Sequence, residues 1–380
     1  MSELKRAESF GTQDGEKPEE YYLMNKDVVI AKFKVIGEGE LERIFIIEEY
    51  NKLPVWIGDL GRFIRNRRAP KHRENIEKLL QISGCDTISG YLNLTHALSL
   101  VDTFWVKPVD NTLEWKSVSL FRNPFNEVIA KTAFDGGLHG RDFGTTSPEY
   151  GTDGSFAKCW IRENGVIKML KRGSSGARNA GREPYSEFYA SQIAKEFGQE
   201  YVDYSLRTCD SKLCSVCECF TSEELGYLPF TAVDKQSTGI ADVLDTASEF
   251  GLEKEFRTMF VLDAVIFNED RHKGNFGFLV NNAAQTVEGF APLFDHNISL
   301  LTYAEEEDLT GFTDYVKGRR PRLGSTFVSV AKAVMTPELR KVLINLSDFE
   351  FTRDKKYNLP EWRLKALEKI MHQQIKDILN

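Results

Sequence analysis

A polar interruption of an apolar stretch is the first part of the sequence that could carry chemistry. The segment VLDAVIFNEDRHKGNFGFLV spans residues 261–280, and polar residues and glycine separate its two apolar ends. Within it, four residues lie between Asp270 and Asn275. Protein kinases use this spacing, in which the Asp orients the nucleophile and accepts its proton, and the Asn holds Mg²⁺. The spacing is common by chance, so the interpretation needs a second acidic site.

The segment FAPLFDHNISL supplies that second site. Asp295 follows a short apolar run that we expect to be a strand. It would take the role of the second metal-binding Asp in phosphoryl transfer. Each residue also has a plainer interpretation, since Asp295 could cap a turn and Asp270 could be a loop carboxylate paired with Arg271. Their order along the chain, between these predicted elements, favours the catalytic interpretation.

The elements around these residues predict an α+β, two-lobed protein-kinase-like fold. AKCWIRENGVIKMLK has the pattern of a β-hairpin, PYSEFYASQIAKEFG that of an amphipathic helix, and YVDYSLRT and KLCSVCECF those of strands. A mainly helical half with two short strands, FGFLV and FAPLF, follows. We therefore divide the chain into a disordered tail, an accessory N-terminal subdomain, a small β-rich N-lobe with one helix, and a larger helical C-lobe: 1–20, 21–149, 150–225 and 226–380.

Composition limits the classes of function. The chain has 380 residues, with 49 Lys and Arg against 57 Asp and Glu, for a net charge of −8. This balance argues against direct nucleic-acid binding. No apolar run approaches the roughly 20 residues that span a bilayer, and the polar N-terminus does not resemble a signal peptide. We therefore expect a cytoplasmic protein with no membrane span.

Two clusters of similar residues require interpretation. Four of the six cysteines lie in CDSKLCSVCECF, where only one Cys-x2-Cys pair occurs and no His is near. This favours a strand with reduced thiols over a zinc site. The basic stretch GRFIRNRRAPKHRENIEKLL could touch phosphate, but its pattern favours the solvent-facing side of two helices separated at Pro70.

The motifs NEDRHKGNFGFL and APLFDHNISL closely resemble those of HipA-like kinases, a bacterial group that also resembles phosphoinositide kinases around Asp-Arg-His. The resemblance extends upstream to KCWIRENGVIKMLKRGSSG, EPYSEFYAS and the hinge-like strand SVCECF. It covers roughly residues 150–300, and the match over 21–149 is looser. It implies an enzyme that uses ATP and Mg²⁺.

The resemblance also implies roles for individual residues. Asp270 would be the catalytic base, Asn275 and Asp295 the Mg²⁺ ligands, and His272 a structural or transition-state-supporting group. Lys168 and Lys171 are both candidates for the nucleotide-binding lysine, and three positions apart on a strand they point to opposite faces. The family pattern favours Lys171. Glu187 on the following helix would be its ion-pair partner, although a solvent-exposed helix Glu is the alternative.

The nucleotide would be held by two further segments. We expect the glycine-rich loop YGTDGSFAK, with Gly151, Gly154 and Ser155, to approach the phosphates, because glycine lets backbone N–H groups come close. HipA-type loops begin with a phosphorylatable Ser where this chain has Gly151, which puts autoinhibition by loop phosphorylation in doubt. Adenine contacts would come from the backbone near Glu218, Cys219 and Phe220.

Three functions remain open at this point. The first is a kinase that phosphorylates Ser or Thr of a protein, with a toxin–antitoxin or regulatory system as its context. The second is a phosphoinositide-kinase-like enzyme for a lipid or small molecule, which the basic segment KGRRPR, residues 317–322, would suit. The same segment could equally recruit an acidic protein. The third is a regulatory subunit that binds a small DNA-binding antitoxin-type partner, since the chain has no evident helix-turn-helix of its own.

Overall fold

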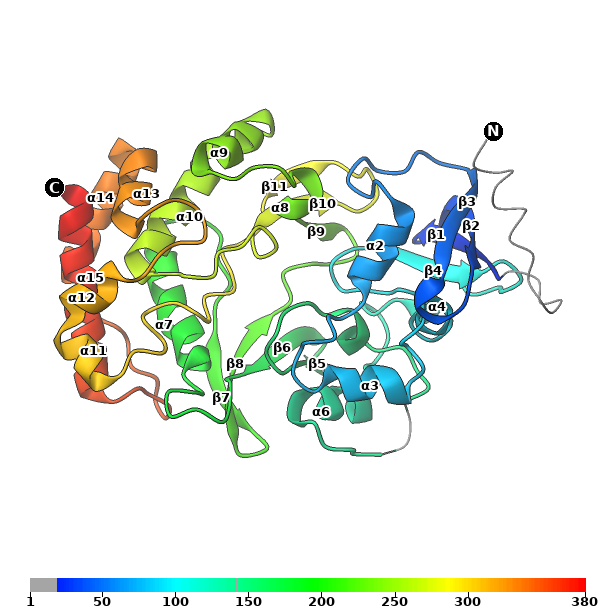
Figure 1. Ribbon diagram of the computed structural model, residues 1–380, viewed down its shortest axis with the longest axis horizontal. Helices are drawn as coiled ribbons and strands as arrows, with labels where there is room; N and C mark the ends of the chain where they lie inside the picture. The colour runs from blue at the N-terminus through cyan, green and yellow to red at the C-terminus, as the bar shows by residue number, and fades with distance from the viewer. Residues whose placement is uncertain (1–18, 141–142) are drawn as a thin grey trace.

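The computed structural model describes residues 19–140 and 143–380. The expected tail, residues 1–20, therefore lies almost entirely outside the described residues. Figure 1 shows the chain extending from an N-terminal sheet at one end to the C-terminal helices at the other. Across the described ranges, no helix is both long enough and apolar enough to cross a membrane.

The N-terminal sheet has four strands in the order β3-β2-β1-β4. Its strands are β1 (Glu20–Asn25), β2 (Val28–Ile36), β3 (Arg43–Glu49) and β4 (Phe104–Pro108). Three helices pack with it around a separate hydrophobic core. They are α2 (Leu60–Arg67), α3 (Ile76–Ile82) and α4 (Ile88–Thr95). This part of the chain buries enough apolar surface to form a unit beside the lobes that follow.

The basic stretch that spans α2 and α3 is not wholly solvent-facing, and our interpretation was wrong for two of its arginines. Arg67 and Arg73 are buried. Arg67 makes a two-pronged ion pair with Asp102, with N–O distances of 2.6 and 2.9 Å. Arg73 donates to the carbonyl oxygens of Glu149 and Thr152. The Asp102 carboxylate compensates Arg67 for lost hydration, whereas Nε and Nη2 of Arg73 have no hydrogen-bond partner among the described residues.

The second sheet has the order β5-β6-β8-β7. Its strands are β5 (Lys158–Glu163), β6 (Val166–Arg172), β7 (Ser205–Cys209) and β8 (Lys212–Glu218). The expected hairpin is confirmed, and its turn residues Asn164 and Gly165 both have the positive φ of a tight hairpin turn, 51° and 82°. The expected helix is also confirmed as α7 (Glu183–Glu196), with Pro184 in its first turn.

Helix α6 (Glu127–Asp135) joins the two sheets. Its Ile129 and Ala133 belong to the N-terminal core. Its Ala130 and Phe134 pack with residues of β5, β6 and β8. The two sheets are thus linked through one helix, and the domain limits drawn at 149 and 225 stay a prediction.

The C-terminal part is mainly helical and is built around α10 (Glu253–Ile266), which is buried on all sides from Thr258 onward. A small sheet of order β11-β10-β9 packs beside it. Its strands are β9 (Leu225–Pro229), β10 (Gly277–Asn281) and β11 (Val287–Phe290). The surrounding helices are α8 (Phe230–Val233), α9 (Ile240–Glu249), α11 (Glu306–Thr310), α12 (Phe312–Lys317), α13 (Phe327–Val334), α14 (Pro337–Asn345) and α15 (Glu361–Leu379). A further short helix, α5 (Trp115–Val118), follows β4.

One strand expectation here is wrong. We expected a strand over 290–294 that ends at Asp295, but β11 ends at Phe290. The following segment pairs only through a single parallel bridge between Leu293 and Tyr201. Pro292 has no N–H to donate to a ladder, which explains why the strand does not continue. Asp295 therefore lies in an irregular segment, with a left-handed φ of 58°.

Candidate active site

The loop between α10 and β10 is held in a compact shape by its own hydrogen bonds. Helix α10 ends at Ile266, and its capping residue Phe267 has a left-handed conformation. The Asn275 side-chain amide donates to the carbonyl oxygen of Asp270 at 2.8 Å. The backbone N–H of His272 donates to the same carbonyl at 2.7 Å, and that of Asn275 donates to the carbonyl of His272 at 3.0 Å. These bonds fix the separation of Asp270 and Asn275 that the sequence singled out.

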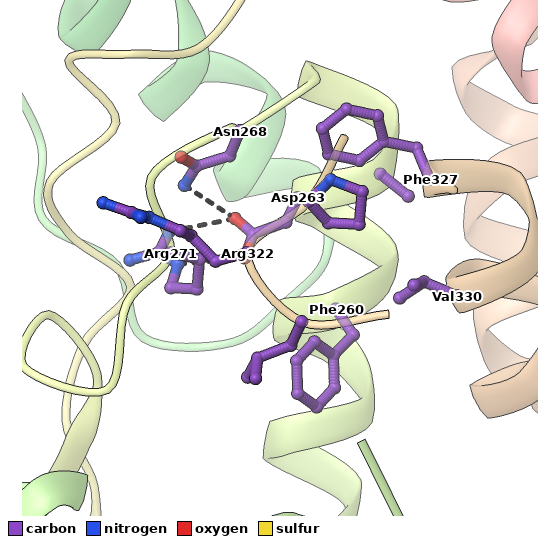
Figure 2. Close-up of a pocket in the computed structure, with 10 residues that line it drawn as sticks. Phe260, Asp263, Asn268, Arg271, Arg322, Phe327 and Val330 are labelled. Atoms are coloured by element: carbon purple, nitrogen blue, oxygen red, sulfur yellow. Dashed lines mark hydrogen bonds and ion pairs between the residues drawn. The ribbon is translucent and has the colours of Figure 1, made fainter. Parts of the chain in front are cut away.

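Arg271 ties this loop to its surroundings. It is buried and donates to both carboxylate oxygens of Asp263 in α10, at 2.9 and 3.0 Å. It also donates to the carbonyl oxygens of Asn275 and Phe294. Figure 2 shows Asp263 receiving both Arg271 and Asn268. The sequence analysis missed Asp263, although a lone Asp in the apolar run VLDAVIF signals a buried charge that needs a partner.

A second cluster joins the N-lobe sheet to the segment of Asp295. The Lys171 ammonium donates to Glu187 of α7 at 2.8 Å and also contacts the Asp295 carboxylate. Ser215 of β8, the cross-strand neighbour of Lys171, donates to the other oxygen of Glu187. The structure thus brings together three of the predicted site residues.

Burial and charge oppose each other in this cluster. Burial alone would lower the pKa of Lys171, but the carboxylates of Asp295 and Glu187 outweigh it, and the pKa is raised. Burial would raise the pKa of Asp295, but the ammonium groups of Lys171 and Lys158 hold that pKa below its usual range. The lysine is therefore charged and Asp295 ionised at neutral pH.

The alternative lysine is placed elsewhere. Lys168 lies opposite Glu218 in the ladder between β6 and β8, and its ammonium is 3.6 Å from a carboxylate oxygen of Glu163. No contact joins it to Glu187 or Asp295 among the described residues. The geometry therefore favours Lys171.

Lys158 is a further side chain beside this cluster, and the sequence analysis missed it. It is the direct cross-strand neighbour of Lys171 in the hairpin, so both side chains lie on the same face of the sheet. Its ammonium donates to the carbonyl oxygen of Asp153 at 2.7 Å. Burial and the charge of Lys171 lower the pKa of Lys158 to about 7. The signal was present in the sequence, because the two-residue turn at 164–165 fixes the register that pairs these lysines.

The glycine-rich loop divides between two surroundings. Gly154 has a φ of 93°, and a Cβ at this position would collide with the Lys158 ammonium. Ser155 is exposed, and its carbonyl oxygen accepts from the N–H of Glu74 at 3.0 Å. Gly151 differs from our expectation, because it packs against the carbonyl oxygens of two accessory residues, Arg67 and Leu98. Gly154 thus lies beside the lysines, whereas close packing explains the glycine at 151.

The hinge-like strand offers only part of the backbone that we expected for adenine. The N–H of Cys219 already donates to the carbonyl oxygen of Ile167 at 2.9 Å. In an antiparallel ladder the adjacent backbone groups, those of Glu218 and Phe220, point to the opposite side. The Phe220 ring packs against those of Tyr227 and Phe294. An adenine contact through the N–H of Cys219 is therefore not supported, while contacts through its neighbours stay a prediction.

Asn275 and Asp295 offer oxygens that suit a magnesium ion. The side-chain oxygen of Asn275 is buried without a hydrogen-bond partner, while its amide nitrogen is 3.5 Å from an Asp295 oxygen. Magnesium sites of this kind use one or two protein oxygens and complete the coordination with water and substrate phosphate. No cluster of three or more His, Cys, Asp or Glu side chains within residues 19–140 and 143–380 could hold a metal by itself. The residues present therefore fit Mg²⁺ bound together with a nucleotide.

Two further side chains complete the description of this loop. His272 is exposed, and its Nδ1 accepts from the backbone N–H of Gly274 at 3.0 Å, which supports the turn. Arg322, which the sequence analysis did not place in the site, donates twice to Oδ1 of Asp270, at 2.9 and 3.1 Å.

Comparisons with known proteins found similar sequences and structures. No protein-family model matches the chain. The serine/threonine-protein kinase CtkA of Helicobacter pylori strain J99 is 27% identical over 137 residues, which cover 32% of this chain and 42% of that protein. The chain therefore matches less than half the length of this curated relative. A solved structure of the Helicobacter pylori proinflammatory kinase CtkA aligns with a TM-score of 0.46 at 20% identity, over 58% of this chain and 91% of that one.

A whole-chain match comes from the solved complex of the Shewanella oneidensis MR-1 toxin–antitoxin proteins HipA and HipB with operator DNA. It has a TM-score of 0.51 and 10% identity, and covers 94% of this chain and 99% of the other. This match confirms the α+β, two-lobed kinase-like fold with an N-terminal accessory part. The chain is thus similar in part of its sequence to the kinase CtkA and shares the fold of HipA over nearly its whole length.

Proposed function

We propose that this protein is a kinase that transfers the γ-phosphate of ATP to Ser or Thr of a protein. One observation carries the proposal: residues from both lobes converge on Asp295. Lys171 of the N-lobe contacts it from one side, and Asn275 of the loop that contains Asp270 lies on the other. This arrangement provides a cation for phosphate, oxygens for a metal and a carboxylate for the acceptor hydroxyl.

In the proposed reaction, Asp270 orients the acceptor hydroxyl and accepts its proton. The hydroxyl oxygen forms a bond to the γ-phosphorus, the bond from that phosphorus to the bridging oxygen breaks, and ADP leaves. Lys171 and Lys158 bind phosphate oxygens, and Glu187 holds Lys171 in place. Magnesium held by Asn275 and Asp295 would neutralise charge on the phosphates when it is bound.

Incubation of the purified protein with γ-labelled ATP and a cell lysate tests the proposal. We expect label in Ser and Thr of lysate proteins, and its loss in Asp270→Ala. Asp245→Ala is the matched control, because it removes an exposed carboxylate of α9. If the wild type labels no more than Asp270→Ala, protein phosphorylation by this site is refuted.

A second candidate, a lipid or small-molecule kinase, draws support from the basic residues 317–322 beside Asp270. It predicts that inositides, and not proteins, stimulate the release of label from ATP. Labelled proteins without labelled inositides would contradict it.

We also propose a small DNA-binding partner of the antitoxin type, since the structure that matches over the whole chain is of a complex that contains HipB and operator DNA. Such a partner should copurify with this chain from its native cells. Recovery of the chain alone would argue against a stable complex.

A further inference from the structure

The basic segment, residues 317–322, carries four cationic side chains and reaches the catalytic loop from the C-lobe. Its Arg322 binds Asp270, and its Arg319 lies 3.6 Å from the carboxylate of Glu269. Two adjacent acidic residues of the loop are therefore each met by an arginine of this segment. Lys317 and Arg320 remain exposed.

Packing fixes the backbone of this segment while its charged ends stay in solvent. Pro321 and Leu323 lie against α10 and α13, around a cavity of about 10 Å³, which is room for about one water molecule. Arg322 lines this cavity together with Phe327 and Val330 of α13, and Figure 2 shows these residues around it. The side chain of Arg322 is nevertheless 59% exposed. A fixed backbone with an exposed guanidinium suits a side chain that exchanges partners.

The Arg322 contact occupies one oxygen of the carboxylate that the proposed reaction uses. Nε and Nη2 of Arg322 both donate to Oδ1 of Asp270. Oδ2 of Asp270 receives no hydrogen bond from any described residue. An acceptor hydroxyl must approach this carboxylate within hydrogen-bonding distance. While Arg322 is in place, it competes with the hydroxyl for Oδ1 of Asp270 and partly neutralises the charge of the base.

We propose that Arg322 is a specificity residue for acidic acceptor segments: a carboxylate beside the acceptor hydroxyl binds Arg322, draws it from Asp270 and frees the base. The inference rests on the proposed function and names its substrate class. An exposed ion pair is weak enough to be exchanged for another of the same kind. The other two exposed cations of the basic segment, Lys317 and Arg320, extend the charge complementarity to an acidic chain.

The position of Arg322 argues against a role in holding ATP. The phosphate-binding side of the site is formed by Lys171 and Lys158, which are both buried on the N-lobe sheet. Arg322 meets Asp270 from the C-lobe and is open to solvent. Its partner should therefore arrive with the acceptor and not with the nucleotide.

Mapping of phosphorylation sites by mass spectrometry tests this inference. A dephosphorylated lysate is treated with ATP and either wild type, Arg322→Ala, Arg322→Lys or Asp270→Ala. The charge-matched control is Arg340→Ala, which removes an exposed arginine of α14. Melting curves check that each variant is folded. Sites absent with Asp270→Ala are scored for Asp and Glu within three residues of the acceptor.

We expect wild-type sites to be enriched in flanking Asp and Glu. Arg322→Ala should lower the ratio of acidic to neutral sites about threefold to fivefold, the effect of one exposed ion pair. Arg322→Lys should keep part of the preference, and Arg340→Ala all of it. A role in stability alone would lower labelling of all sites equally and would leave the ratio unchanged.

Two results would overturn the inference while the proposed function stands: wild-type sites without acidic flanks, or a ratio that Arg322→Ala does not change. Labelled inositides in place of proteins would also overturn it, in favour of the second candidate. A complete absence of Asp270-dependent sites on proteins would instead refute the proposed function itself.

Discussion

Replacing Lys171 with Met removes the only cation that contacts Glu187 among the described residues. Both partners are almost fully buried, with 6% and 1% of their side chains exposed. Removal of one partner of such a pair leaves an uncompensated buried charge and costs about 3–5 kcal/mol of the free energy of unfolding. Lys168→Met is the matched control on the same strand. Its partner Glu163 is 39% exposed, so its loss should cost about 0–1 kcal/mol.

The carboxylates of Glu187 and Asp295 determine how the stability of Lys171→Met changes with pH. In the wild type, the Lys171 ammonium keeps the pKa of Asp295 in the folded protein below its value in the unfolded chain. The ion pair therefore stabilises the fold at any pH above the unfolded-state pKa of Asp295, and this stabilisation is lost as the pH falls through the folded-state pKa. In Lys171→Met, Glu187 and Asp295 face each other without this cation, and at least one folded pKa should rise above its unfolded value. The free energy of unfolding of the variant should therefore fall as the pH rises from about 5 to about 8, because the unpaired carboxylates become ionised. Its difference from the wild type should reach the full value given above near pH 8.

Urea unfolding of the wild type and both variants at pH 5 and pH 8 measures this. We expect the free energy of unfolding of Lys171→Met to lie well below that of the wild type, by an amount that grows with pH. For Lys168→Met the difference should be small and independent of pH. Only Lys171→Met should lose labelling. Equal deficits for the two variants, or a deficit of Lys171→Met that shrinks as the pH rises, would refute the reasoning.

Three further predictions concern the same site. Arg271→Ala leaves the buried Asp263 without its cationic partner, so the free energy of unfolding should fall by about 3–5 kcal/mol in urea unfolding. A change below about 1 kcal/mol would contradict the role of Arg271. The pKa of Lys158 is about 7, so kcat/KM for ATP should fall as the pH rises through that value. Lys158→Arg should remove this fall, and a fall that persists would exclude Lys158 as its cause. Gly154→Ala should raise the KM for ATP, because its Cβ would collide with Lys158. Gly176→Ala, with nearly the same φ of 91° but open space around it, is its control, and equal effects of the two would leave only backbone strain as the cause.

The sequence predicted correctly those elements that are determined by residues close together in the chain. The turn residues Asn164 and Gly165 determine the hairpin and its register, and the apolar spacing together with Pro184 determines α7. The loop of Asp270 and Asn275 was visible because polar residues interrupt a buried run. In each of these cases the physical signal lies within about 20 residues of chain.

The remaining features depend on contacts between distant segments. Arg67 resembles its solvent-exposed neighbours in the sequence, and only Asp102, 35 residues away, shows that it is buried and paired. Arg322 lies 52 residues from Asp270. The strand β9 ends in proline and lacks an apolar alternation, so only its pairing with β10 identifies it.

Phosphoproteomics of cells that express either the wild type or Asp270→Ala tests the central claim most directly. The account predicts a set of Ser and Thr sites that are phosphorylated with the wild type and absent with the variant at equal protein levels. Identical phosphorylation in the two cell populations would contradict it.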